Sequence, residues 1–270
     1  MPCPLTDTAL FMSRPAILVT GGATRIGAAI VRGFADAGWH VVIHYKDSDA
    51  QAERLAATLP SAQTIGCDLS DPAAAAAMVA DLAAQLGDWR CLVNSASVFP
   101  YDDATNCDPA TNIEAMTVNA LAPTLMAQAF LAKATSAALR CVIQITDMKL
   151  ENPNPDFFSY TMSKHALAAT IKMLAQGAEA RGDDRARIYG IAPGAILASH
   201  DQSEDETEIS HRLNLLQRKT GADEIVDAAL FLASGALKSG QSLFIDSGQH
   251  LLSQPRDVIY LAREPAPAAQ

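Results

Sequence analysis

Positive charge is scarce in this chain of 270 residues. Lys and Arg number 20 against 30 Asp and Glu, and the formal net charge is −10. Nucleic acids and anionic membranes are bound through basic surfaces, because their phosphates need positive counter-charge. The composition therefore argues against nucleic acid and membrane as partners and favours a small-molecule substrate.

Aromatic residues and cysteines are also few. Aromatics make up 6% of the chain against 49% hydrophobic residues, so we expect an aliphatic core rich in Ala. The five cysteines show neither CxxC pairing nor zinc-like spacing. We therefore expect buried free thiols in a reducing compartment and no metal site.

Long hydrophobic runs and targeting segments are missing as well. We find no apolar run long enough to span a bilayer, and the N-terminus lacks the charged-then-apolar order of a signal peptide. These absences predict a cytoplasmic protein. No linker or internal repeat divides the chain, so we expect a single domain at residues 14–255. Residues 1–13 and 256–270 are expected to be weakly ordered terminal extensions.

What the chain does contain is a regular alternation of short β-rich runs and longer Ala-rich helical stretches. This alternation predicts an α/β fold of the Rossmann type, a doubly wound parallel sheet of seven strands with helices on both faces. Ligands of such sheets gather at the carboxyl ends of the strands. The expected strands lie at residues 16–22, 40–45, 62–69, 90–97, 140–147, 185–194 and 241–248.

The first expected strand ends in a glycine-rich turn, TGGATRIG at residues 20–27, which opens a helix. Glycines let the backbone approach a pyrophosphate, whose charge is favoured by the amides of a helix N-terminus. The spacing is T-G-x-x-x-R-x-G, with Arg25 between the outer glycines. Alone this is a weak signal, because Gly-rich turns also simply join a strand to a helix.

Further motifs follow along the chain in a fixed order: CDL at 67–69, NSAS at 94–97, Asn119, and Tyr160 with Lys164. Together with the glycine turn they resemble the short-chain dehydrogenase/reductase family. The family pattern T-G-x-x-x-G-x-G differs only in its middle glycine. The resemblance extends over residues 17–248.

Each motif also has an ordinary structural explanation. Asp68 can cap a helix, Asn94 can serve a turn, and Asn119 can be a buried hydrogen-bonding side chain. Their common order over nearly the whole chain favours the family. The resemblance then implies a nicotinamide cofactor bound by Gly21, Thr24, Arg25, Ile26, Gly27, His44, Tyr45, Lys46, Ser48, Asp68, Leu69, Asn94, Ser95, Ala96, Tyr160, Lys164, Pro193, Gly194 and Ile196.

The end of the second expected strand, HYKDS at residues 44–48, bears on which cofactor is bound. NAD enzymes usually place an acid there for the ribose diol, and an acid repels a 2′-phosphate. Lys46 and Ser48 suit a phosphate, with Arg25 reaching across from the glycine turn. Asp47 favours NAD unless it points to solvent. The balance of charge predicts NADPH.

Tyr160 and Lys164 are four residues apart in an expected helix and therefore share one face. A nearby ammonium favours the phenolate, so we expect Lys164 to lower the pKa of Tyr160 toward the range for proton transfer. The resemblance also implies that Lys164 holds the nicotinamide ribose. The alternative is an exposed Tyr and Lys on a helix surface.

Asp147 stands 13 positions before Tyr160, where most members of the family carry a Ser. A carboxylate is a poor neighbour for a carbonyl oxygen that gains negative charge, but it suits a substrate with ring nitrogens and an amino group. The substitution resembles one branch of the family, the pteridine reductases with the dihydromonapterin and folate-type reductases. The alternative is that Asp147 caps a helix.

Two further features resemble that branch. Arg25 matches the Arg of its glycine turn, and NSASVF at residues 94–99 resembles its N-x-A-S-x-F. The resemblance implies that Ser97 contacts the cofactor at the substrate site and that Phe99 stacks on the pterin. An ordinary core or loop aromatic is the alternative for Phe99. The candidate substrate-binding residues are Ser97, Phe99, Asp147 and Tyr160.

The chain departs from the family after the sixth expected strand. Pro193 and Gly194 are followed by Ala198, where the family's P-G-x-x-x-T has a Thr that contacts the nicotinamide amide. The pterin branch commonly lacks this Thr too. The acidic run HDQSEDETE at residues 200–208 covers the position of the substrate lid, and we expect its carboxylates to be solvated.

These features predict an NADPH-dependent oxidoreductase that reduces a pterin-like heterocycle, of the dihydropterin or dihydrofolate type, by hydride transfer. Tyr160 would donate the proton, Asn119 would position the proton relay, and Asp147 would anchor or protonate the heterocycle. The alternatives are a carbonyl or 3-oxoacyl reductase and a non-catalytic NADP-binding sensor, which would need neither Tyr160 nor Lys164. By resemblance, the Tyr160 helix is expected to pair subunits into a homotetramer or homodimer.

Overall fold

The computed structural model describes residues 14–199 and 202–263. In these residues seven parallel strands form one sheet in the order β3-β2-β1-β4-β5-β6-β7, which confirms the predicted doubly wound fold. The expectation of weak order at residues 1–13 and 264–270 lies outside the described residues. The strands are β1 (Ala16–Val19), β2 (His40–Tyr45), β3 (Ala62–Gly66), β4 (Trp89–Asn94), β5 (Arg140–Ile145), β6 (Ala186–Pro193) and β7 (Ser242–Ile245).

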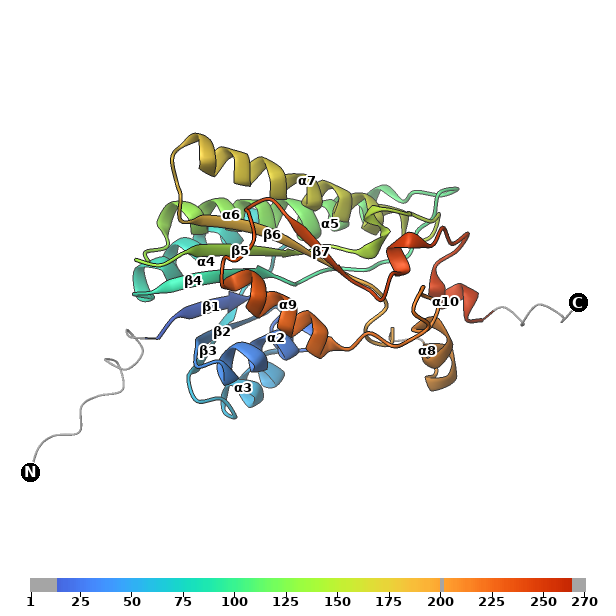
Figure 1. Cartoon of the computed structure of the whole chain (residues 1–270), viewed down its shortest axis with the longest axis horizontal. Helices are drawn as coiled ribbons and strands as arrows, with labels where there is room; N and C mark the ends of the chain where they lie inside the picture. The colour runs from blue at the N-terminus through green and yellow to red at the C-terminus, as the bar shows by residue number, and fades with distance from the viewer. Residues whose placement is uncertain (1–13, 200–201, 264–270) are drawn as a thin grey trace, which may run out of the picture.

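Helices cover both faces of this sheet (Figure 1), with α4, α6 and α7 on one face and α2, α3 and α9 on the other. The α-helices are α2 (Arg25–Asp36), α3 (Asp49–Ala56), α4 (Pro72–Gln85), α5 (Pro109–Met116), α6 (Ala122–Lys133), α7 (Phe158–Ala180), α8 (Glu204–Ser210), α9 (Ala222–Ala233) and α10 (Val258–Leu261). Short helical turns of other types are the π-helix η1 (Thr117–Leu121) and the 3₁₀ helices η2 (Met148–Leu150) and η3 (Gln249–Leu251).

Strand β1 shows why its sequence is apolar without alternation. Ala16 and Leu18 pack into the core under α4 and α6, whereas Ile17 and Val19 pack into the core under α2 and α9. Successive side chains of a strand point to opposite faces, so a strand covered on both faces is apolar throughout. All four residues are at most 2% exposed.

The order of the strands places a crevice at the carboxyl ends of β1 and β4. The chain moves outward from β1 to β3 and then returns to β4 on the other side of β1. Successive connections therefore leave these two strand ends in opposite directions, which is where doubly wound sheets bind ligands. Thr20 joins the two ends, because its hydroxyl accepts hydrogen bonds from the backbone N–H groups of Ser95 and Ala96 at 2.9 and 3.0 Å.

The helical run Pro109–Lys133, made of α5, η1 and α6, corrects one sequence expectation. By length and composition this run is apolar enough to cross a membrane, although no such run was expected. More than half of its most apolar window is buried inside the fold, as in a core helix. Its apolar character follows from packing against the sheet, where Met126 and Phe130 are fully buried.

The C-terminal tail corrects a second expectation. Residues 256–263 were expected to belong to a weakly ordered extension, but they form a capped helix that packs on the carboxyl-end side of the sheet (Figure 1). Asp257 accepts a hydrogen bond from the backbone N–H of Ile259 and so begins α10. Val258 and Ile259 are at most 7% exposed. Burial of these apolar side chains explains why the segment is part of the fold.

Candidate active site

A cavity of about 590 Å³ lies at the carboxyl ends of the strands. Most of the predicted site residues meet on its walls. Those that line it are Gly21, Thr24, Arg25, Ile26, Gly27, Ser95, Ala96, Ser97, Phe99, Asp147, Tyr160, Lys164, Pro193, Gly194 and Ile196. The predicted residues outside this lining are His44, Tyr45, Lys46, Ser48, Asp68, Leu69, Asn94 and Asn119.

The glycine turn presents free backbone amides to the cavity. Thr24 is the N-cap of α2 but its side chain makes no capping hydrogen bond, so the first N–H groups of α2 are left for a ligand. Gly21 has φ +61°, and a Cβ on Gly27 would lie 2.2 Å from the carbonyl oxygen of Gly21. Only glycines permit this close turn, and an anion such as a pyrophosphate fits the amides it exposes.

Arg25 lies where the family pattern has its middle glycine, and its backbone conformation explains why a glycine is usual there. Its φ is +53°, in the left-handed region that glycine adopts most readily. Its guanidinium donates to the carbonyl oxygens of Ala198 at 2.9 Å and Leu197 at 3.4 Å. The side chain therefore reaches to the segment after β6, and the expectation that Arg25 holds a 2′-phosphate together with Lys46 stays a prediction.

The ends of β2 and β3 form a separate polar surface beside the glycine turn. Lys46 makes an ion pair with Asp68 at 3.0 Å, with both side chains about half exposed. Asp47 is exposed to solvent, which was the condition for favouring NADPH. Ser48 is the N-cap of α3, and its hydroxyl makes no capping hydrogen bond. Lys46, Ser48 and the α3 amides can therefore meet a phosphate at this surface.

His44 holds the glycine turn in place through hydrogen bonds to the backbone. Its Nδ1 accepts a hydrogen bond from the backbone N–H of Gly21 at 3.2 Å, and its Nε2 lies 3.0 Å from the carbonyl oxygen of Cys67. Burial lowers the pKa of His44 to about 4, so the imidazole is neutral at pH 7. The backbone partners then place the proton on Nε2. His44 positions the turn instead of lining the cavity.

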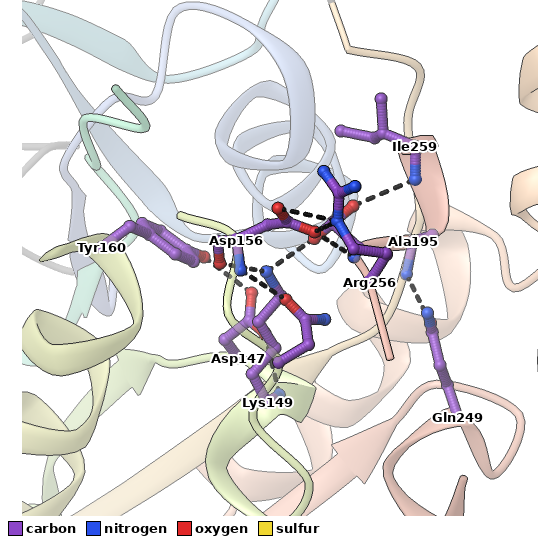
Figure 2. Close-up of polar contacts among 10 residues, drawn as sticks. Asp147, Lys149, Asp156, Tyr160, Ala195, Gln249, Arg256 and Ile259 are labelled. Atoms are coloured by element: carbon purple, nitrogen blue, oxygen red, sulfur yellow. Dashed lines mark hydrogen bonds and ion pairs between the residues drawn. The ribbon is translucent and has the colours of Figure 1, made fainter. Parts of the chain in front are cut away.

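Asp147 and Tyr160 are hydrogen-bonded to each other on the cavity wall (Figure 2). The Tyr160 hydroxyl donates to Oδ2 of Asp147 at 2.7 Å, and Oδ1 of Asp147 accepts from the backbone N–H of Lys149 at 2.9 Å. Asp147 is therefore both the N-cap of η2 and a polar group of the cavity. The expected alternative of a structural cap is confirmed, and the second oxygen of Asp147 remains directed at Tyr160 in the cavity, so its role toward a substrate stays a prediction.

Lys164 follows Tyr160 by one helical turn in α7 and is 3% exposed. Its Nζ donates to the carbonyl oxygen of Ile145 at 2.9 Å and lies 5.5 Å from the centre of the Tyr160 ring. An exposed surface pair is therefore excluded. The ammonium lies at the carboxyl end of β5, beside the Tyr160 ring.

The pKa values of the three groups correct a sequence expectation. Burial, reinforced by the neighbouring Asp147 carboxylate, raises the pKa of Tyr160 well above its usual value, although Lys164 was expected to lower it. Burial also raises the pKa of Asp147 and lowers that of Lys164 to about 8. A phenolate beside a buried carboxylate is unfavourable, so Tyr160 keeps its proton and can supply it to a bound substrate.

Asn119 and Asn94 lie outside the cavity lining, and their hydrogen bonds are made to other residues of the chain. The Asn119 amide accepts from the backbone N–H of Val98 at 2.9 Å and donates to the Val98 carbonyl at 2.9 Å and to Ser163 at 3.0 Å. It lies in the π-helix η1, and its hydrogen bonds hold the segment that carries Ser97 and Phe99. Asn94 donates to Gln144 and to the Pro123 carbonyl within the core.

Phe99 forms part of an aromatic wall. Its ring stacks on Phe157 with centroids 3.9 Å apart, and it meets the Tyr160 ring edge-on at 4.5 Å. Phe99 is nevertheless 39% exposed and lines the cavity. One face of the Phe99 ring is therefore covered by Phe157, while the residue still exposes apolar surface to a flat ligand.

Sequence reasoning missed the contribution of the C-terminal tail to this cavity. Lys149 makes an ion pair with Asp257 at 2.6 Å, and their side chains are 3% and 6% exposed (Figure 2). Asp156 joins the same cluster by binding Arg256 and the backbone N–H of Asp257. The available signal was the run DVIYL at 257–261, in which a capping residue precedes apolar ones.

The missed residues also include side chains from η3 and α8. Gln249 accepts a hydrogen bond from the backbone N–H of Ala195, and Ser210 and His211 line the cavity at the end of α8. The acidic residues of α8 lie at its N-terminus, where Ser203 and Glu206 form a capping box. His200 and Asp201, the start of the acidic run, lie outside the described residues.

Comparisons with known proteins place this site in a family. A family model described as Enoyl-(Acyl carrier protein) reductase matches residues 21–250. Pteridine reductase 1 of Leishmania tarentolae is 28% identical, over 88% of this chain and 96% of its own length. A putative ketoacyl reductase of the granaticin polyketide synthase of Streptomyces violaceoruber is 26% identical, over 88% and 97% of the two chains.

A solved structure is similar to this chain over most of its length. The crystal structure of FolM alternative dihydrofolate reductase 1 from Brucella canis, complexed with NADP, is 31% identical to this chain with a TM-score of 0.82. The alignment covers 90% of this chain and 96% of that one. The matching family model, the solved relative and the Tyr160–Lys164 cavity agree, and the chain belongs to the short-chain dehydrogenase/reductase family.

Proposed function

We propose that the chain is an NADPH-dependent reductase of a pterin-like heterocycle, of the dihydropterin or dihydrofolate type. The observation that carries the proposal is the carboxylate of Asp147 in the cavity, hydrogen-bonded to Tyr160 at 2.7 Å. Similarity to pteridine reductase 1 and to the FolM alternative dihydrofolate reductase supports it. Both relatives carry names that refer to reduction of a pterin or folate.

The residues present fit an NADP cofactor. Uncapped amides of α2 meet the pyrophosphate, and Lys46 with Ser48 meets the 2′-phosphate. Lys164 and the segment Pro193–Gly194 border the end of the cavity where Tyr160 lies. The bound cofactor supplies a hydride at that end.

The side chains of this protein then supply orientation and a proton. Tyr160 keeps its proton because burial raises its pKa, and it passes that proton to the reduced heterocycle directly or through water. Asp147 accepts hydrogen bonds from ring nitrogens and an amino group when ionised and donates one when protonated, and burial raises its pKa, which favours the protonated form. Phe99 offers an apolar surface to the flat ring, and Asn119 holds the Phe99 segment in place.

A carbonyl or 3-oxoacyl reductase is the competing function, because the family model and the Streptomyces relative are named for acyl reductases. The same Tyr–Lys pair serves that chemistry. Asp147 distinguishes the two, because a buried carboxylate repels an oxygen that gains negative charge during hydride transfer. A hydroxyl at this position would stabilise that oxygen.

The test is oxidation of NADPH measured with dihydrobiopterin, dihydrofolate, a simple ketone and a 3-oxoacyl thioester. We expect turnover with a dihydropterin or dihydrofolate and little with the ketone and the thioester. Asp147→Ser should abolish most pterin reduction and leave NADPH binding intact. Asp147→Asn keeps the acceptor that caps η2, so its loss of activity would separate chemistry from folding. Preferred reduction of the thioester, or full pterin reduction by both variants, would overturn the proposal.

A further inference from the structure

Gln249 has a buried amide nitrogen without a partner at the wall of the cavity. The residue is 2% exposed, and Nε2 is one of the buried side-chain nitrogens and oxygens in the described residues that make no hydrogen bond. Its Oε1 accepts from the backbone N–H of Ala195 at 3.0 Å (Figure 2). That backbone group is a donor, so the amide oxygen must face it and the amide nitrogen must face elsewhere.

An unpaired buried amide nitrogen is unfavourable, so we expect a bound ligand to accept a hydrogen bond from it. Leaving such a donor unsatisfied costs about 1–3 kcal/mol of desolvation. The amide of Gln249 is nevertheless held in place, because it packs against the backbone of Gly194, where a Cβ would lie 2.6 Å from Oε1. A glycine at position 194 is what allows this packing. The arrangement fixes the amide at the cavity wall, with its oxygen toward Ala195 and its nitrogen left without a partner.

The chemistry of the cofactor indicates which of its groups can accept a hydrogen bond from the Gln249 amide. Gln249 touches the Gly194–Ala195 backbone just after β6, and β6 pairs with β5, at whose end Lys164 binds the Ile145 carbonyl. The nicotinamide end of the cofactor offers an amide donor one obvious acceptor, the carboxamide oxygen. Ala198, where the family pattern has a hydroxyl, has no side-chain polar group to make this bond.

We propose that Nε2 of Gln249 donates a hydrogen bond to the carboxamide oxygen of bound NADP(H). Gln249 thereby fixes the rotation of the nicotinamide ring about the cavity wall. It is a positioning residue, because it acts on the cofactor and not on the substrate. The inference rests on the cofactor alone, so it holds for a pterin reductase and for a carbonyl reductase alike.

The test compares two ligands by isothermal titration calorimetry, NADP⁺ and 2′-phospho-ADP-ribose, which lacks the nicotinamide. In Gln249→Met the affinity for NADP⁺ should fall roughly three- to tenfold, the effect of one net hydrogen bond, while the affinity for the fragment stays within about twofold. Gln254→Met is the matched control, because that amide bonds to Leu213 outside the cavity lining, and it should change neither affinity. Equal losses for both ligands, or unchanged NADP⁺ affinity, would overturn the proposal.

A second measurement uses the unaltered protein and so does not depend on how the variant folds. The acetylpyridine analogue of NADP⁺ keeps the carbonyl oxygen, and the aminopyridine analogue lacks it. The unaltered protein should prefer the acetylpyridine analogue, and Gln249→Met should reduce that preference by roughly three- to tenfold. A preference that is absent from the unaltered protein, or undiminished in the variant, would show that another group binds the oxygen.

Discussion

Burial shifts the pKa values of three ionisable side chains in the cavity, Asp147, Tyr160 and Lys164. The Tyr160 hydroxyl is bound to Asp147, and burial raises the pKa of both groups while it lowers the pKa of Lys164 to about 8. Burial disfavours the charged form of each group, which moves acids upward and bases downward. In this cavity burial therefore favours the protonated forms of Asp147 and Tyr160 and the neutral form of Lys164.

Tyr160→Phe removes the proposed proton donor and tests this role. General acid catalysis is typically worth about 10²–10⁴-fold, so kcat with a dihydropterin should fall by roughly that factor while NADPH affinity stays nearly constant. Steady-state kinetics and calorimetry measure the two quantities. Tyr101→Phe is the control, because its hydroxyl pairs with Asp103 outside the cavity lining and should leave kcat unchanged. An unimpaired Tyr160→Phe would assign the proton to another group.

The pH dependence of NADP⁺ binding should follow Lys164. Its pKa is lowered from 10.5 to about 8 by burial, so the side chain is cationic below pH 8 and neutral above it. Loss of a cation weakens attraction for an anionic cofactor, so affinity should fall as the pH rises through about 8. Calorimetry on both sides of pH 8 measures the change. Lys164→Met should lack this step, and a step that persists in the variant would belong to a different group.

At the scale of elements, a buried ion pair joins α10 to η2. Lys149 of η2 and Asp257 at the N-cap of α10 pair at 2.6 Å, and the Lys149 ammonium lies 5.1 Å from the Phe157 ring centre. Both members of the pair line the cavity. The tail is therefore a wall of the site, attached by an interaction that is favourable only while both charges are present.

Lys149→Met should destabilise the protein, because it leaves the Asp257 carboxylate buried and unpaired. Removal of one partner of a buried pair costs about 3–5 kcal/mol, and urea unfolding measures the loss. Lys149→Met/Asp257→Leu should recover part of it, since no buried charge then remains. Glu208→Gln removes the acceptor of exposed pairs with Arg212 and Lys219 and should change stability little. Equal effects of Lys149→Met and Glu208→Gln would show that the buried pair contributes nothing special.

At the scale of the whole molecule, the face formed by α5, η1 and α7 exposes more apolar side chains than a helix layer in contact with water needs. Helices α5 and α7 pack side by side (Figure 1), and exposed side chains on them and on η1 include Ile113, Leu121, Met162 and Met173. Their exposed fractions lie between 43% and 67%. Exposed apolar side chains gathered on neighbouring helices are typical of interaction sites. We propose that this face pairs two copies of the chain, in a homodimer or homotetramer.

Multi-angle light scattering at micromolar concentration tests the assembly. The unaltered protein should be larger than a monomer, and Ile113→Glu/Met173→Glu should dissociate it, because each substitution places a charge in an apolar contact. Leu216→Glu is the control, since Leu216 is 62% exposed but lies outside α5 and α7. A monomeric unaltered protein would contradict the expectation that the Tyr160 helix pairs subunits.

The sequence by itself determined the sheet, the glycine turn and the meeting of Asp147, Tyr160 and Lys164. Apolar runs such as β1 predict buried strands because side chains on both of their faces need apolar partners. Tyr160 and Lys164 meet because four residues of helix bring them to one face. The position of Asp147 before Tyr160 was also readable, because β5 and α7 are consecutive along the chain. Such features depend on neighbours close in sequence.

Only the tertiary structure decided the charges and partners of those residues. Burial and the contact with Asp147, not the helical neighbour Lys164, set the direction of the Tyr160 pKa. The turn of Arg25 toward Ala198 and the pairing of Lys149 with Asp257 join segments far apart in the chain. No local pattern specifies such contacts, because each depends on which distant side chain fills the remaining space and excludes water. The same holds for the unpaired amide of Gln249, which is visible only once the fold has buried it.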